Sequence, residues 1–225
     1  MYRHYRQLLD GPRQQFYDWL YSGLAAGIPY LDSSRWPIEE IHSAIRSILL
    51  DNPSVCHFEG CWEYRQGIIP HYTMPSSSVQ ALINKAQQIR LSGEIPPAAY
   101  DYLLKNTVYD ISAPHSQSAW GAMMDGKAVC KGIAKAYQLL LHLHNIPCIL
   151  VEGSLDGILN HVWNLVWDGS RWYHVDVTMG YPQFRHLVGG TESRCGYDFA
   201  FSTAVHTIYH PELLPINSEG GIYHA

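Results

Sequence analysis

Three residues in the second half of the chain could work together as a nucleophile, a base and an acid: Cys130, His161 and Asp176. Cys130 opens a run with helical periodicity, and the free N–H groups of a helix N-terminus stabilise a thiolate over a thiol. An imidazole beside a thiolate can hold its proton, and a carboxylate can orient that imidazole. Each residue alone also suits a structural role, such as a small core cysteine. Together they predict a thiol nucleophile with its base and orienting acid.

The elements that must position these residues are one helix and three strands. A helix is expected over 129–144, where apolar residues follow Cys130 at helical spacing, and the NIP sequence at 145–147 ends it. Strand-like runs follow at 147–153, 160–167 and 171–178. A helix followed by an antiparallel meander predicts an α+β fold.

The turn between the last two strands decides how His161 and Asp176 meet. A two-residue turn at 168–169 places His161 directly opposite Asp176, whereas a turn at 169–170 leaves it diagonal to Asp176. Both registers keep the two side chains on one face of the sheet, and only a one-residue slip separates them. Alternation also puts Trp163 on that face, where its ring could exclude water.

The motifs around these residues resemble the transglutaminase-like superfamily. The matching segments are GKAVCKGIAKA at 126–136, NIPC at 145–148, HVWN at 161–164 and VDVT at 175–178, within about residues 119–180. The resemblance implies a papain-like core, with the catalytic cysteine at a helix N-terminus packed on an antiparallel sheet. It also implies acyl transfer from a peptide or protein amide through a Cys130 thioester. The family includes transamidases, deamidases, peptidases and peptide N-glycanases, so the reaction stays open.

The groups that would stabilise an oxyanion are less well marked. The backbone N–H of Cys130 is the natural first donor, and the Trp120 indole is a candidate for the second, with Gln117 as a competitor. Hydrophobic packing explains Trp120 equally well. Ile133 and Met179 depart from residues frequent in the family, and we expect them to reshape the wall of the pocket.

The first part of the chain reads as a mostly helical N-terminal extension over 1–95, before a catalytic core over 96–225. Residues 4–24 are helical in pattern, with an interruption at Gly11-Pro12. Residues 54–74 are rich in strand-forming types, and 111–129 reads as a loop. Further helices are expected at 38–50, 76–92 and 97–108.

Composition narrows the classes of partner. A net charge of −5 and a pI near 6.2 leave no basic footprint for nucleic acid or a membrane surface. The N-terminus is polar, without a signal-peptide pattern, and five cysteines do not suggest a disulfide framework, so a reducing cytoplasm is expected. The thirteen histidines show no metal-site spacing, and neither a metal nor another cofactor is expected. The oligomeric state is left open.

The sequence therefore favours a cysteine enzyme that cleaves or transfers peptide or protein amides, with hydrolysis slightly preferred over cross-linking. The alternative is a catalytically silent peptide-binding module of the same fold, which usually has lost one of the three residues. Redox sensing by Cys130 would need a resolving thiol, and Cys148 is the nearest candidate in sequence.

Overall fold

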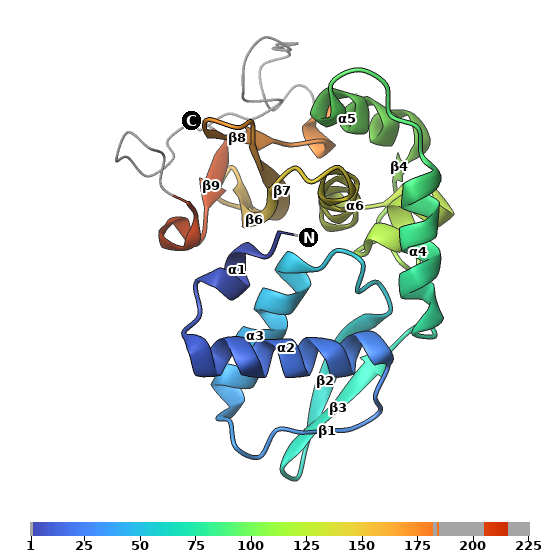
Figure 1. The fold of residues 1–225 in the computed structure, drawn as a ribbon. Helices are drawn as coiled ribbons and strands as arrows, with labels where there is room; N and C mark the ends of the chain where they lie inside the picture. Colours follow the sequence, from blue (N-terminus) through green and yellow to red (C-terminus); the bar gives the residue numbers. More distant parts are fainter. Residues whose placement is uncertain (1, 182–183, 185–204, 216–225) are drawn as a thin grey trace. The chain divides into compact units, whose positions relative to one another are not determined.

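The computed structural model describes residues 2–181, 184 and 205–215, and the chain divides into two compact units. One unit comprises Arg3–Asn84, and the other begins at Lys85 and includes Tyr2. Helix α4 (Ser77–Gln88) contains the division (Figure 1). The domain boundary that the sequence suggests at 95–96 stays a prediction, because compactness alone does not define a domain.

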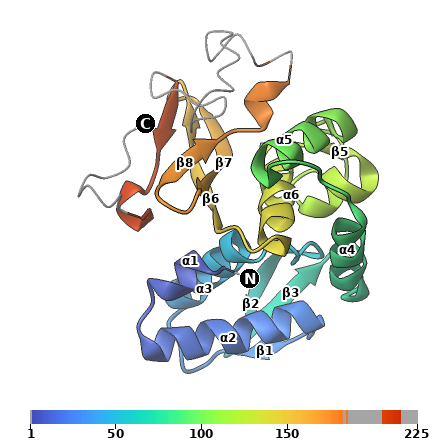
Figure 2. The same ribbon diagram turned by 45° about the horizontal axis from the view of Figure 1, so that its top comes forward.

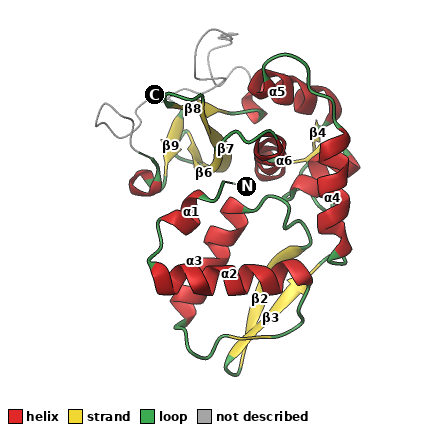
Figure 3. Ribbon diagram, in the orientation of Figure 1, coloured by secondary structure: helices red, strands yellow, loops and turns green. Residues whose placement is uncertain are grey.

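The first unit combines helices with a small sheet (Figure 3). Its three strands pair antiparallel in the order β1-β3-β2, so the strand-rich segment 54–74 contains a hairpin. Its elements are α1 (His4–Gln7), α2 (Gly11–Ala26), β1 (Leu31–Asp32), α3 (Ile38–Asp51), β2 (Phe58–Tyr64) and β3 (Gly67–Tyr72). The expected helices near the N-terminus and the expected strands within 54–74 are therefore both observed.

Helix α2 begins at the Gly11-Pro12 pair that the sequence suggested as an interruption. Asp10 is its N-cap, and its carboxylate accepts a hydrogen bond from the backbone N–H of Arg13 at 3.0 Å. Proline suits the first turn of a helix because the N–H that it lacks has no partner there. The break in the helical pattern therefore lies before Gly11, between α1 and α2.

A buried carboxylate joins the helices of this unit. Asp51 accepts hydrogen bonds from the backbone N–H groups of Tyr5 at 3.0 Å and Arg6 at 2.9 Å, and from the Tyr17 hydroxyl at 3.0 Å. Burial raises the pKa of Asp51 to about 6, although these donors act in the opposite direction. The bonds tie α1 and α2 to the end of α3.

The second unit is built on a four-stranded antiparallel sheet in the order β8-β7-β6-β9. Helix α6 packs against β6 and β7 (Figures 1 and 2). The elements are α5 (Ile95–Asn106), β4 (Val108–Tyr109), η1 (Gly121–Asp125), β5 (Lys127–Ala128), α6 (Cys130–Leu143), β6 (Cys148–Leu155), β7 (Leu159–Trp167), β8 (Trp172–Val175), η2 (Thr178–Gly180), β9 (His206–Ile208) and η4 (Pro211–Leu213). The predicted α+β meander is confirmed, with β9 added at its edge.

The two ends of α6 have clear local causes. At its C-terminus Asn145 adopts the left-handed conformation with φ 59°, which asparagine tolerates better than most residues. The N–H of Ile146 then bonds the carbonyl of Leu141 at 3.0 Å, and that of Asn145 bonds the carbonyl of His142 at 3.1 Å. These two bonds satisfy carbonyl groups that the helix end would leave free.

The loop before α6 lies directly against the first turn of that helix. The N–H of Val129 donates to the carbonyl of Ser116 at 3.0 Å, and a Cβ on Gly132 would overlap the same carbonyl oxygen. Gly132 therefore allows this close backbone approach, because it has no side chain. Residues 121–125 form a π-helical turn rather than loop, which ends at Gly126 with φ 69°.

No helix within the described ranges is long and apolar enough to span a membrane.

A methyl group at Gly132 should displace the loop that borders Cys130. Gly132→Ala is expected to lower the free energy of unfolding by about 1–3 kcal/mol, the usual cost of overpacking. The matched control is Gly11→Ala, where an added Cβ meets nothing within 4 Å. Denaturant unfolding of both variants tests the effect, and equal stability of the two would contradict the contact with Ser116.

Candidate functional site

Cys130 is the first residue of α6 and is partly exposed. The N-cap residue, Val129, is extended and contributes no side-chain cap among the described residues. The first N–H groups of α6 are therefore left to partners other than an N-cap side chain. The other three cysteines of the described part, Cys56, Cys61 and Cys148, form no disulfide with one another or with Cys130, and Cys195 lies outside the described residues.

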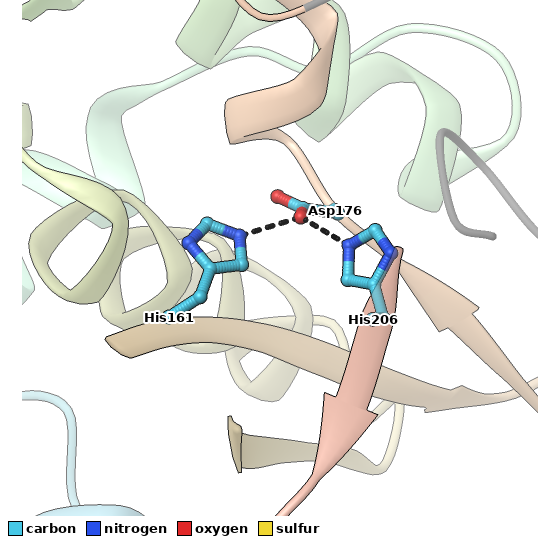
Figure 4. A group of neighbouring side chains, drawn as sticks. All are labelled: His161, Asp176 and His206. Atoms are coloured by element: carbon cyan, nitrogen blue, oxygen red, sulfur yellow. Dashed lines mark hydrogen bonds and ion pairs between the residues drawn. The ribbon is translucent and has the colours of Figure 1, made fainter. Parts of the chain in front are cut away.

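Two imidazoles converge on one carboxylate oxygen (Figure 4). Nε2 of His161, on β7, lies 2.6 Å from Oδ2 of Asp176, which follows β8. Nε2 of His206, on β9, lies 3.0 Å from the same oxygen. All three side chains are buried, so the cluster is held away from bulk water.

The strand register is the second of the two that the sequence allows. Leu165 pairs with His174 and Asn164 with Val175, which is the register with Trp163 opposite Asp176. His161 is then diagonal to Asp176 on the same face, and its hydrogen bond spans that diagonal.

Each oxygen of the Asp176 carboxylate has two hydrogen-bond partners. Oδ1 accepts the backbone N–H groups of Thr178 at 2.9 Å and Met179 at 3.4 Å, while Oδ2 accepts the two imidazoles. Burial alone would raise the pKa of Asp176, but His161 and His206 outweigh it and hold that pKa far below its usual range. The group is a fixed anion at neutral pH.

The charge of Asp176 sets the protonation of His161. Burial by itself would lower the pKa of His161, but the Asp176 carboxylate overcomes this effect, with help from Cys130, and raises the pKa to about 10. Because Nε2 faces Asp176, Nδ1 is the ring nitrogen left for Cys130. The arrangement can support an imidazolium beside the sulfur.

Trp163 stiffens the cluster. Its ring stacks on His161 with centroids 5.9 Å apart and planes inclined by 20°. Its indole N–H donates to Nδ1 of His174 at 2.8 Å, and the Trp163 side chain is fully buried. A Cβ at Gly153 would collide with this ring, so a glycine there makes room for it. The expected place of Trp163 on the His161 face is observed.

The two candidates for a second oxyanion donor, Trp120 and Gln117, have different surroundings. The Trp120 indole N–H donates to Asp125 at 3.2 Å, and the other carboxylate oxygen of Asp125 lies 2.8 Å from Nδ1 of His115. That N–H is therefore engaged within its own loop. Gln117 is exposed and lies next to Ser116, whose carbonyl abuts α6. The roles of Trp120 and Gln117 stay predictions.

Sequence reasoning missed two residues of this site. His206 lies 30 residues beyond Asp176, outside every motif, so only strand pairing brings it in. Tyr109 lies on β4, which pairs in parallel with β5, the short strand just before Cys130. In this pairing Tyr109 lies beside Ala128. Its hydroxyl interacts with the backbone N–H and side chain of Cys130, and burial raises the pKa of Tyr109 to about 12.

The cluster also has the composition of a metal site. Ligand atoms of His161, Asp176 and His206 lie within 4.8 Å of one another. The hydrogen bonds on Asp176 nevertheless account for the arrangement without a cation, and a metal would have to replace the protons on both Nε2 atoms. The sequence-based expectation of a metal-free site stays a prediction.

The comparisons with known proteins agree with the resemblance noted from sequence. A family model described as the transglutaminase-like superfamily matches residues 79–177, a span that includes Cys130, His161 and Asp176. A comparison with curated proteins gave no match.

Two solved structures are similar over part of the chain. One is a TGase (19% identity, TM-score 0.36), matched over 44% of this chain and 30% of that one. The other is a proposed cysteine protease from Cytophaga hutchinsonii (21% identity, TM-score 0.37), matched over 46% of this chain and 37% of that one. The chain thus spans about a third of the length of each structure.

Removing the charge of Asp176 should release the proton of His161. In Asp176→Asn the burial of His161 remains without its counter-ion, so the pKa of His161 should fall from about 10 to below about 6.5. A pH titration of the histidine ring signals by NMR measures this change. His142 is the internal control, because burial lowers its pKa to about 4 and its Nε2 lies 2.9 Å from the Cys148 carbonyl rather than beside a carboxylate.

The raised pKa of His161 also makes the contribution of the His161–Asp176 ion pair to stability depend on pH. The folded pKa of His161 exceeds the unfolded value of about 6.5. The pair therefore contributes fully to stability below that pH and progressively less as pH rises towards 10. A His161 that titrates near pH 6.5 in both proteins would contradict the pairing with Asp176.

Proposed function

We propose that this chain, whose residues 79–177 match the transglutaminase-like superfamily, is a cysteine enzyme that transfers the acyl group of peptide or protein amides. Cys130 is the nucleophile, His161 the base and acid, and Asp176 the residue that orients His161. The observation that carries this proposal is the buried 2.6 Å bond between His161 and Asp176, with the imidazole interacting with Cys130 at the start of α6.

The first half of the reaction forms a thioester. The Cys130 sulfur attacks the amide carbonyl carbon, a C–S bond forms, and the carbonyl π electrons move onto oxygen. Collapse of this intermediate breaks the C–N bond, and the proton on Nδ1 of His161 passes to the departing nitrogen. Ammonia or an amine leaves, depending on whether the amide is a side-chain or backbone group.

The second half restores the enzyme. His161, now neutral, takes a proton from the acceptor as its oxygen or nitrogen attacks the thioester carbonyl carbon. Collapse of this second intermediate breaks the C–S bond, and the Cys130 sulfur leaves as the thiolate. Water as acceptor gives hydrolysis, and an amine gives a new amide. Both outcomes return the sulfur and imidazole to their starting state. We favour hydrolysis, and the acceptor is what the activity measurement below decides.

The Asp176–His161 hydrogen bond supports an enzyme rather than a silent binding module. A module that only binds peptides has no need for a buried carboxylate, and such a charge costs several kcal/mol unless it is compensated. Here the first cause of that compensation is the imidazole that interacts with Cys130, with His206 adding to it. The geometry therefore favours catalysis over binding alone.

Selective alkylation tests whether Cys130 is an activated nucleophile. Cys61 is the internal control, since it is also partly exposed but burial and Glu63 raise its pKa. At pH 6–7 iodoacetamide should modify Cys130 at least about tenfold faster than Cys61, because only thiolates react. Peptide mapping by mass spectrometry gives both rates in one sample.

His161→Ala provides the decisive comparison. In this variant the preference for Cys130 over Cys61 at pH 6–7 should disappear, since the imidazolium that stabilises the thiolate is gone. Equal alkylation of the two thiols in the parent protein would refute the proposed nucleophile.

Activity is then screened with glutamine-containing peptides and with peptides cleavable at the backbone, with and without a primary amine. The measured products are ammonia, cleaved peptide and peptide that has incorporated the amine. Cys130→Ser should lower the rate by about a thousandfold or more.

His206 is proposed as a positioning residue, which acts on the substrate only through Asp176. Losing its hydrogen bond to a charged acceptor should cost about 1.5–3 kcal/mol, or a 10- to 100-fold drop in kcat for His206→Ala. His206→Gln retains an N–H donor and should recover much of the loss. The acidic limb of the pH–rate profile should also shift in His206→Ala.

The control for His206 is His142→Gln, a change at another buried histidine that bonds a backbone carbonyl remote from Asp176. It should leave the pH–rate profile unchanged. If His206→Gln loses as much activity as His206→Ala and neither shifts the profile, His206 has no positioning role.

A further inference from the structure

The first unit contains a cavity that the proposed chemistry does not use. It has a volume of about 420 Å³ and lies between the start of α2 and the segment 32–36. This volume falls within the roughly 300–1,000 Å³ typical of small-molecule sites. All its lining residues lie between 12 and 36, outside the segment 79–177 that matches the superfamily.

One wall of the cavity is made of three aromatic rings that are nearly parallel. The Phe16 ring stacks on Trp36 with centroids 4.4 Å apart and planes inclined by 17°. It also stacks on Trp19, at 5.8 Å and 19°. Phe16 is buried, whereas Trp19 is 44% exposed. The rings are therefore stacked over one another, and the Trp19 ring is the one that is largely exposed to solvent.

The rest of the lining is polar and carries both donors and acceptors. Gln15, Asp32, Ser34 and Arg35 line the cavity and are exposed. Ser33 also lines it, is only 3% exposed, and its hydroxyl has no hydrogen-bond partner among the described residues. A buried hydroxyl without a partner is costly, and a ligand that hydrogen-bonds it would remove that cost.

The charges at the cavity balance. Asp32 supplies one negative and Arg35 one positive charge, and the Asp32 carboxylate accepts the Ser34 N–H at 3.1 Å. The nearby cation Arg13 is already paired with Glu40 at 2.6 Å and Asp10 at 2.7 Å. This balance disfavours a phosphate, a carboxylate or a cation as the ligand and favours a neutral one.

An exposed indole beside mixed donors and acceptors suits a sugar ring. The C–H groups of a pyranose form an apolar face that packs on indole, and its hydroxyls both donate and accept hydrogen bonds. We infer that this cavity is a binding site for a neutral oligosaccharide, with one ring stacked on Trp19. A proline-rich peptide could stack on the same rings but would leave most of the polar groups without partners.

Direct titration tests this assignment on the full chain. The probes are the neutral hexasaccharides of β-1,4-linked N-acetylglucosamine, glucose and xylose, with a decaproline peptide as the competing class. Binding is followed by quenching of tryptophan fluorescence and by calorimetry. We expect saturable binding of at least one hexasaccharide and none of decaproline. Binding of decaproline alone, or of no hexasaccharide, would overturn the inference.

Variants locate the binding. Trp19→Ala should weaken the affinity at least about tenfold, because it removes an exposed ring of the wall. Ser33→Ala should weaken it as well. The matched control is Trp62→Ala, which removes a tryptophan that is 59% exposed on β2 and does not line the cavity, and it should keep the parent affinity.

Two further measurements keep the result unambiguous. Circular dichroism and thermal unfolding show whether each variant is folded, so a loss of binding is read only from folded protein. Cys130→Ser should bind as the parent does, which separates this site from the proposed catalysis. Unchanged affinity in folded Trp19→Ala would show that the cavity is not the binding site.

Discussion

The buried carboxylate of Asp176 is the point on which the second unit depends. An ion removed from water costs several kcal/mol unless hydrogen bonds and opposite charge replace its hydration. Here the replacements come from β7, β9 and the turn after β8, as two imidazoles and two backbone N–H groups. The strand order that forms the sheet is therefore also the order that makes the charge tolerable.

Cys130, the proposed nucleophile, is placed by a separate set of contacts. Asn164 on β7 donates to the carbonyl of Ala134 in α6 at 3.1 Å, which fixes the helix against the strand that carries His161. The first turn of α6 is also bordered by the Ser116 carbonyl, which fits only because residue 132 is glycine. The sheet thus positions His161, and the loop and Asn164 position Cys130.

The local parts of this site could be predicted from sequence, and the distant parts could not. Helix periodicity and strand alternation place Cys130, His161 and Asp176 on the right elements, because these patterns repeat over few residues. The register was ambiguous; Asp168 accepts the N–H groups of Ser170 at 2.7 Å and Arg171 at 2.8 Å, and these bonds select one turn.

Tertiary contacts leave weaker marks in a single sequence. Tyr109 approaches Cys130 through a pairing of only two residues on each strand, too short to show as a pattern. Its hydroxyl interacts with the Cys130 N–H, the donor proposed from the sequence to bind an oxyanion. In the proposed reaction, a substrate carbonyl would displace that hydroxyl or share the donor with it. The Phe184 ring packs edge-on against Tyr109, with centroids 4.8 Å apart, so a movement of Tyr109 that frees this donor would also change the contact with Phe184.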